Sequence, residues 1–166
     1  MTIFLREATV ADAEAVMRLH MRCHEEAYGQ HLPSEFFDLR RQTLPGRIEN
    51  LEKAIVAGHI PTVACDQQGL VGVAAAGHSE DPRAPKPLEL RMIYTLERVY
   101  GRGVGQLLLD AVTGSKAAFL WVLADNPRAH AFYVKNGFAL DGATDFMDEA
   151  WHRLPIVRMV REAADE

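Results

Sequence analysis

The spacing of apolar residues along the N-terminal half predicts one strand followed by helices. Alternation at Ile3 and Leu5 is typical of a half-buried strand. From Ala13 onward the apolar positions recur at helical spacing, and Gly58 stands where glycine commonly ends a helix. We therefore expect a strand over 3–9, a helix over 13–28, a helical region broken by Pro33 and Pro45, and a helix over 47–57.

The second half alternates strand-like and helix-like segments. Asn126-Pro127 is a helix start signal, with asparagine at the cap and proline at the first position. We expect strands over 61–66, 70–77 and 88–95, a helix over 105–113, a strand over 117–124, a short helix ending at Gly137, and strands over 138–140 and 155–160. This order predicts the α/β class, with a mixed α+β sheet in a single domain spanning 1–166.

Composition narrows the class of protein. The chain has 166 residues, 48% of them hydrophobic and 25% charged, which is typical of one globular domain. No apolar run approaches the roughly 20 residues of a membrane helix, and no signal peptide is evident. With only Cys23 and Cys65, a disulfide framework is not expected, and we predict a cytoplasmic protein without a membrane partner.

Charge is unevenly distributed. The net charge of −5 argues against nucleic-acid binding, which depends on Lys and Arg neutralising phosphates. Between Arg83 and Arg102, however, basic residues outnumber acidic ones. A local basic stretch in an acidic protein suits one small polyanionic ligand.

Three alternating glycines, Gly101, Gly103 and Gly105, lie between a predicted strand and a predicted helix. Glycine lets a backbone approach a ligand closely, and a helix N-terminus attracts phosphate, so this loop predicts a pyrophosphate site. Arg98 and Arg102 would add positive charge. Two alternatives stay open: a turn without a ligand, and a dinucleotide-binding loop that lacks its third glycine. A P-loop is excluded, since no Gly-Lys-Ser/Thr follows.

A second segment decides how the glycine loop is interpreted. It reads Asn126-Pro127-Arg128-Ala129-His130-Ala131-Phe132-Tyr133-Val134-Lys135-Asn136-Gly137-Phe138. Together with Leu90-Arg91-Met92-Ile93-Tyr94-Thr95 and the glycine loop, it resembles the signature stretches of the GNAT superfamily of N-acetyltransferases, over about 88–140. The resemblance implies a GNAT-like acyl-CoA N-acyltransferase fold, with acetyl-CoA as co-substrate and an amine as acceptor.

The resemblance also implies roles for individual residues. The pantetheine arm would contact Ile93, Tyr94 and Thr95; the pyrophosphate would contact Gly101, Arg102, Gly103, Val104, Gly105 and Gln106; Asn126 would touch the cofactor; and Tyr133 would protonate the leaving thiolate. The loop departs from the family by starting with Tyr100 in place of Arg or Gln. Without the resemblance, the spacing of Tyr133 suits a core aromatic.

The catalytic base is less constrained. Some members of the GNAT superfamily place a glutamate six residues before the end of the strand that is expected here over 88–95, and Glu89 matches that position. The alternative is a surface glutamate paired with a nearby arginine. His20, Cys23 and His24 share one helix face, but a fourth ligand is not evident and no metal site is expected.

The acceptor is left open by the sequence. In the family the acceptor pocket involves segments that correspond here to 28–37 and 141–152, with Tyr28, His31, Phe36 and Trp151 as candidate walls. Residues 141–151 contain no Lys or Arg, which would attract a cationic amine or mark a solvated loop. The acceptor remains either a small-molecule amine or a protein amine. A homodimer remains a possible assembly. A non-catalytic acyl-CoA sensor and a dinucleotide enzyme remain alternative functions.

Overall fold

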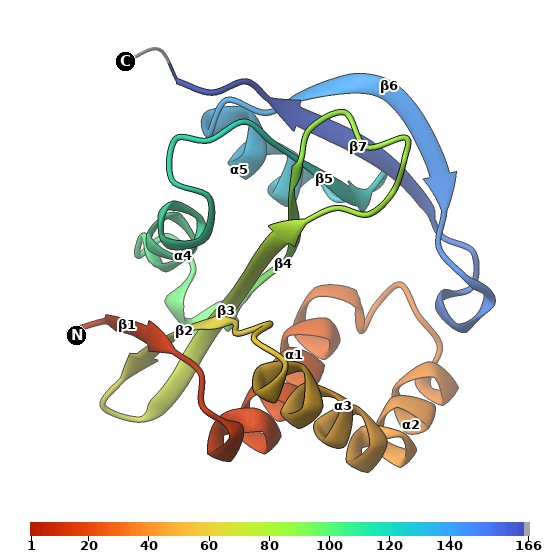
Figure 1. Ribbon diagram of the computed structural model, residues 1–166. Helices are drawn as coiled ribbons and strands as arrows, with labels where there is room; N and C mark the ends of the chain where they lie inside the picture. Colours follow the sequence, from red (N-terminus) through yellow and green to blue (C-terminus); the bar gives the residue numbers. More distant parts are fainter. Residues whose placement is uncertain (165–166) are drawn as a thin grey trace. The chain divides into compact units, whose positions relative to one another are not determined.

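The structure, a computed structural model, describes residues 1–164 (Figure 1). It divides into two compact units. The first comprises Met1–Ala75 and Met92–Val112, and the second comprises Ala76–Arg91 and Thr113–Glu166. Strands β3 (Gly69–His78) and β4 (Leu88–Thr95) contribute residues to both.

The first unit combines the N-terminal strands and most of the helices. Besides parts of β3 and β4, its elements are β1 (Phe4–Glu7), the short 3-10 helix η1 (Val10–Asp12), α1 (Ala13–Tyr28), α2 (Ser34–Gln42), α3 (Leu44–Val56), β2 (Thr62–Asp66), the short 3-10 helix η2 (Glu97–Val99) and α4 (Val104–Thr113) without its last residue. Neighbouring strand residues face opposite sides of the sheet. Val63 and Cys65 pack in one apolar cluster with residues of α1 and α3, whereas Ala64 packs in another with residues of α4.

Helix α4 is anchored by buried apolar side chains near its N-terminus. Val104 and Leu108 are 1% and 0% exposed. Burying each of these side chains contributes about 1.5–3 kcal/mol. The first turn of α4, and with it the end of the glycine loop, is therefore fixed to the core of the first unit.

The second unit is built from the C-terminal elements. They are β5 (Ala118–Leu123), α5 (Pro127–Lys135), β6 (Ala139–Phe146), the short 3-10 helix η3 (Glu149–Trp151) and β7 (Pro155–Arg161), together with the remaining residues of β3 and β4. Its buried apolar side chains include Phe119, Leu120, Phe138 and Met159.

The strands form a seven-stranded sheet in the order β1-β2-β3-β4-β5-β7-β6. The N–H of Leu96 donates to Val71 O and the N–H of Ser79 donates to Pro87 O, so β3 and β4 run antiparallel. β5 pairs in parallel with β4, where Phe119 lies opposite Glu89, and antiparallel with β7. The predicted mixed α/β sheet is confirmed.

Two local predictions need correction. The helical region is interrupted at Pro33, as predicted, but Pro45 lies in the first turn of α3 and the second break falls at Thr43, between α2 and α3. Proline is tolerated in a first turn, where its missing N–H would have no partner. Strand β6 continues to Phe146 rather than Leu140, past a register shift between Leu140 and Thr144 that interrupts its two-residue period.

Candidate functional site

The glycine loop of the first unit has a conformation that requires glycine. Gly101 and Gly103 have φ angles of +73° and +79°, in the left-handed region that side chains disfavour. A Cβ atom built on either one meets nothing within 4 Å. The constraint is therefore in the backbone alone, and the loop presents an open main-chain surface.

The loop leads directly into the N-terminus of α4. The first bond of this helix joins Leu107 N–H to Gly103 O at 3.0 Å. The N–H groups before it, on Val104, Gly105 and Gln106, have no acceptor inside the helix and point along its axis. Such a cluster of donors at the positive end of a helix dipole fits a phosphate group. The residues predicted to hold pyrophosphate therefore fit that ligand.

The two arginines predicted beside the loop differ in their partners. Arg98 donates to both carboxylate oxygens of Asp66 on β2, at 2.6 and 3.2 Å. This contact lowers the pKa of Asp66 below its usual range. Arg102 is exposed, and within residues 1–164 its side chain has no hydrogen-bond or ion-pair partner. Arg98 thus shares its charge with Asp66, whereas the charge of Arg102 is available to a ligand.

The end of β4 is held close to both β3 and α4. A Cβ atom at Gly72 on β3 would lie 2.8 Å from Leu108 Cδ1 and 3.1 Å from Thr95 Cγ2 and Tyr94 O. Only glycine fits this close approach. Ile93 belongs to the apolar cluster that includes α4, and Tyr94 packs against the cluster that includes α1. The three residues predicted to contact pantetheine are therefore firmly placed in the first unit.

A polar cluster in the first unit combines Tyr94, His20 and His24 with two arginines that the sequence analysis did not single out. The ring of Tyr94 lies 4.6 Å from that of His20 and 4.9 Å from that of His24. Burial, together with the charges of Arg40 and Arg47, lowers the pKa of His20 to about 3. The only sequence signal for these arginines is their place on the inward side of α2 and α3. Within residues 1–164 no three His, Cys, Asp or Glu side chains are arranged to hold a metal ion.

The second unit contains the remaining predicted residues. Asn126 caps α5, since its side-chain oxygen accepts from Ala129 N–H at 3.2 Å. Tyr133 on α5 is 9% exposed, and its ring contacts those of Phe132 and Phe138. The assignment of a general acid to Tyr133 stays a prediction.

Glu89 is half-buried on β4, opposite Phe119 of β5. The alternative interpretation is a surface glutamate paired with a nearby arginine. Arg91 instead donates to His78 O at 2.6 Å, and within the described part of the chain Glu89 forms no ion pair. Its role as a base stays a prediction.

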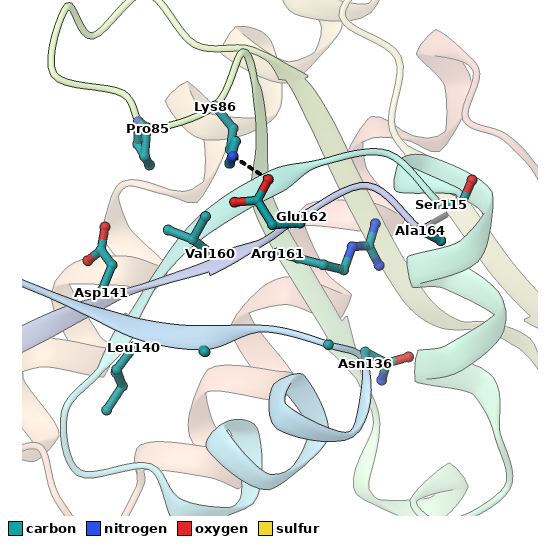
Figure 2. A pocket seen from close by; sticks show the side chains of 12 residues that line it. Pro85, Lys86, Ser115, Asn136, Leu140, Asp141, Val160, Arg161, Glu162 and Ala164 are labelled. Carbon is teal, nitrogen blue, oxygen red and sulfur yellow. Dashed lines mark hydrogen bonds and ion pairs between the residues drawn. The ribbon is translucent and has the colours of Figure 1, made fainter. Parts of the chain in front are cut away.

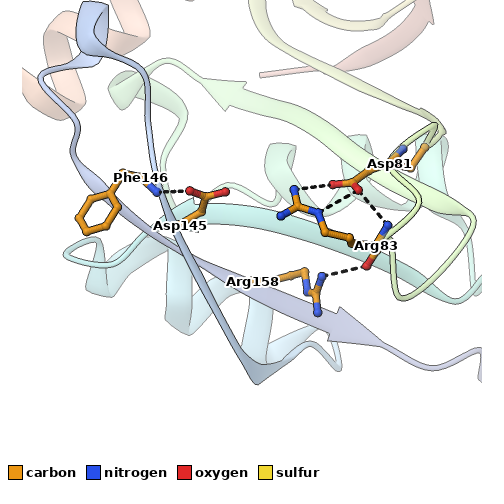
Figure 3. Close-up of polar contacts among 6 residues, drawn as sticks. Asp81, Arg83, Asp145, Phe146 and Arg158 are labelled. Atoms are coloured by element: carbon orange, nitrogen blue, oxygen red, sulfur yellow. Dashed lines mark hydrogen bonds and ion pairs between the residues drawn. The ribbon is translucent and has the colours of Figure 1, made fainter.

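The acidic segment 141–152 is partly neutralised within the second unit. Arg158 on β7 lies 2.7 Å from a carboxylate oxygen of Asp141. Although burial opposes the shift, Arg158 keeps the pKa of Asp141 below its usual range. The same arginine donates to Arg83 O (Figure 3), and Arg83 pairs with Asp81. The segment is therefore less acidic than its sequence indicates.

The second unit also has a surface pocket of about 740 Å³, whose lining includes Asp141 but none of the residues predicted to bind the cofactor or to act in catalysis. Lys86 pairs with Glu162 at 2.6 Å within it (Figure 2). Arg161 donates to the carbonyl oxygens of Gly114 and Lys116, at 2.9 Å each. These charged groups of the pocket are already paired within the protein, so we assign no ligand to the pocket.

A family model of the acetyltransferase (GNAT) domain matches residues 57–140, about half of the chain. The chain belongs to the GNAT acetyltransferase family. It is therefore an N-acetyltransferase that uses acetyl-CoA. The matched range includes every residue that the sequence assigned to cofactor binding or catalysis, from Glu89 to Tyr133.

Solved structures of GNAT enzymes share the fold. The PaiA N-acetyltransferase from Thermoplasma acidophilum, in complex with coenzyme A, is 19% identical, with a TM-score of 0.73 and coverage of 98% of this chain and 99% of that one. The ribosomal-protein-alanine N-acetyltransferase from Brucella melitensis is 21% identical, with a TM-score of 0.66 and coverage of 96% and 99%. At these identities the likeness shows the fold alone. No curated protein matches the GNAT chain, and none of its described helices is long and apolar enough to cross a membrane.

Proposed function

We propose that this GNAT enzyme transfers an acetyl group from acetyl-CoA to a primary amine by direct attack of the amine. The observation that carries the proposal is the open loop with Gly101 and Gly103 at positive φ, leading into the free N–H groups of α4. This loop supports the binding of a pyrophosphate by backbone donors, with Arg102 adding charge. By the resemblance, Ile93, Tyr94 and Thr95 hold the pantetheine arm and Asn126 also contacts the cofactor.

Bound acetyl-CoA supplies an acetyl thioester, whose carbonyl carbon is attacked readily by a neutral amine. The chain's own residues then accept one proton and donate another. Glu89 accepts a proton from the ammonium form of the acceptor, directly or through water, so that the nitrogen can attack. Tyr133 donates its hydroxyl proton to the departing sulfur, since an ordinary tyrosine is protonated at neutral pH. The attacking nitrogen, which is positively charged after the addition, loses one proton as the amide forms, and this proton restores the hydroxyl of Tyr133. Backbone N–H groups stabilise negative charge on the carbonyl oxygen.

The test is a Tyr133→Phe variant, which keeps the ring packed against Phe132 and Phe138. We expect kcat to fall by roughly 10²-fold, since general acid catalysis contributes at least that much. The affinity for acetyl-CoA and the melting temperature should change little, which separates a chemical role from a packing role. An unchanged kcat would show that Tyr133 is only a core aromatic.

The same assay separates an enzyme from an acyl-CoA sensor. Free thiol release is followed with acetyl-CoA and a panel of small amines and peptides with free amino groups. Binding of acetyl-CoA without turnover on any amine would support the sensor. Glu89→Gln should lower kcat and shift the pH profile, and a variant with an unchanged rate and profile would exclude Glu89 as the base.

We further propose a cytoplasmic enzyme, because Cys23 and Cys65 are both free thiols. Each solved relative is covered over nearly its full length by this chain, which supports one acetyltransferase domain spanning 1–166. A small-molecule or a protein amine is the acceptor, and a homodimer stays an open alternative to a monomer.

A further inference from the structure

A cluster of polar side chains lies where α1, α2, α3 and β4 of the first unit meet. Its members are His20, His24, Arg40, Arg47 and Tyr94. The rings of His20 and His24 lie 4.2 Å apart, and both contact Tyr94. Arg47 is close enough to Arg40 that its charge lowers the pKa of Arg40. The cluster thus gathers two positive charges around neutral rings.

Arg47 has donors that the protein does not satisfy. Its Nη2 atom donates to Arg40 O at 2.9 Å and approaches Met21 Sδ at 3.8 Å. Its Nε and Nη1 atoms are buried without a hydrogen-bond partner, as is Nδ1 of His20. Within residues 1–164 no carboxylate lies within ion-pair distance of Arg47. Because buried donors are almost always paired, such a guanidinium points to an acceptor supplied by a ligand.

The neighbouring histidines do not balance the charge of Arg47. Burial, with the two arginine charges, lowers the pKa of His20 to about 3, and His24 behaves alike, so both imidazoles are neutral at neutral pH. Burial and the charge of Arg47 lower the pKa of Arg40 to about 10, which leaves it protonated. Two carboxylates on the same part of α1 are paired with other arginines: Glu25 with Arg41 at 2.6 Å and Glu26 with Arg22 at 3.0 Å.

We propose that Arg40 and Arg47 form an anion subsite that binds the carboxylate of an amino-acid acceptor. The inference rests on the proposed function and adds the chemical class of its acceptor. Arginine is well suited to a carboxylate in a partly desolvated site. Tyr94 links the subsite to the end of β4, which by resemblance holds the pantetheine arm, so the carboxylate and the amine of the acceptor should be only a few bonds apart. Helices α1, α2 and α3 lie before residue 57, outside the range matched by the family model.

The first experiment uses the wild-type enzyme and pairs of acceptors that differ only in the carboxylate. Suitable pairs are phenylalanine with phenethylamine, leucine with isopentylamine, and tryptophan with tryptamine. We expect kcat/KM to be at least roughly tenfold higher for the amino acid, because the amine leaves the buried Nε and Nη1 donors of Arg47 without an acceptor. Equal or faster turnover of the amines would overturn the subsite and leave the proposed function intact.

The second experiment uses variants on neighbouring positions. Arg47→Gln should raise KM for the amino acid at least roughly tenfold and leave KM for the matched amine unchanged, and Arg47→Lys should restore part of the loss. Arg41→Gln is the matched control, because Arg41 is exposed and pairs with Glu25 and Asp38. A loss that is equal for both acceptors, or confined to the melting temperature, would show a structural role and overturn the inference.

A binding measurement separates the two proposals. The melting temperature of the wild type and of Arg47→Gln is measured with phenylalanine or phenethylamine, without acetyl-CoA. The subsite is supported if phenylalanine, but not phenethylamine, raises the melting temperature of the wild type and neither raises that of Arg47→Gln. If this result is obtained and no acceptor is turned over, only the proposed function fails. No rise with phenylalanine, together with no preference in the kinetic assay, overturns the subsite.

Discussion

Replacement of Gly103 by alanine tests the link between backbone conformation and cofactor binding. Gly103 has a φ of +79°, and an added Cβ would meet nothing within 4 Å, so the methyl group causes backbone strain without a clash. The left-handed conformation costs a residue with a Cβ about 1–2 kcal/mol. Alanine also restricts the unfolded chain, which offsets about 0.4–1 kcal/mol. We therefore expect a net loss of about 1 kcal/mol in the free energy of unfolding.

Gly46 offers a matched control in the same chain. It lies in α3, is exposed, and a Cβ atom there would also meet nothing within 4 Å. Alanine is favoured over glycine in a helix by about 1 kcal/mol. The same substitution should thus stabilise the protein at Gly46 and destabilise it at Gly103. The two variants should differ by about 2 kcal/mol, or roughly 4–8 °C in melting temperature for a chain of this size.

Two measurements are needed. Urea unfolding of both variants gives the difference in stability, and titration with acetyl-CoA gives the difference in affinity. If the loop binds pyrophosphate through its backbone, Gly103→Ala should weaken acetyl-CoA binding by about tenfold, which corresponds to about 1.4 kcal/mol. Equal stability of the two variants would refute the strain argument. A destabilised Gly103→Ala protein with unchanged affinity for acetyl-CoA would refute the binding of pyrophosphate by the backbone of this loop.

Two further predictions concern stability. His20 and His24 have pKa values lowered from 6.5 to about 3 and about 2, so the unfolded state binds more protons than the folded state between these values. The free energy of unfolding should reach its full value above pH 6.5 and fall on acidification, by up to about 1.4 kcal/mol per pH unit for each histidine. His24→Phe should reduce the slope of this free energy against pH, relative to an Ala27→Ser control. Equal slopes would contradict this. Asn126→Ala should lose about 1 kcal/mol of helix capping, and Asn126→Ser should regain it; if Asn126 also binds the cofactor, acetyl-CoA affinity will not recover in the serine variant.

Features set by adjacent residues were predicted well from the sequence. Asn126-Pro127 predicted the start of a helix, and the side chain of Asn126 does accept from Ala129 N–H. The glycine loop was predicted between β4 and α4, and Gly101 and Gly103 do adopt positive φ. Such features depend on the conformational preferences of a few neighbouring residues, which a sequence displays directly. Pro33 does lie at a break in the helical region, whereas Pro45, which was expected to interrupt a helix, lies in the first turn of α3.

Features that join distant segments were not predictable. Arg98 was expected beside a phosphate, but Asp66, on another strand, pairs with its guanidinium. Likewise, Asp141 belongs to a segment without basic residues and is nevertheless neutralised by Arg158 of the neighbouring strand. The spacing of charges along the chain carries no information about which strands become neighbours.

By itself, the sequence determined the order of strands and helices, the position of the glycine loop and the family. Each of these depends on short-range periodicity or on the identity of adjacent residues. Only the tertiary structure decided which charges are paired. It brought Arg47 on α3 close to Arg40 on α2 and His20 on α1. It also left the Nε and Nη1 atoms of Arg47 without a hydrogen-bond partner. The physical reason is that burial and pairing are properties of the packed chain, in which residues from four elements share one low-dielectric environment.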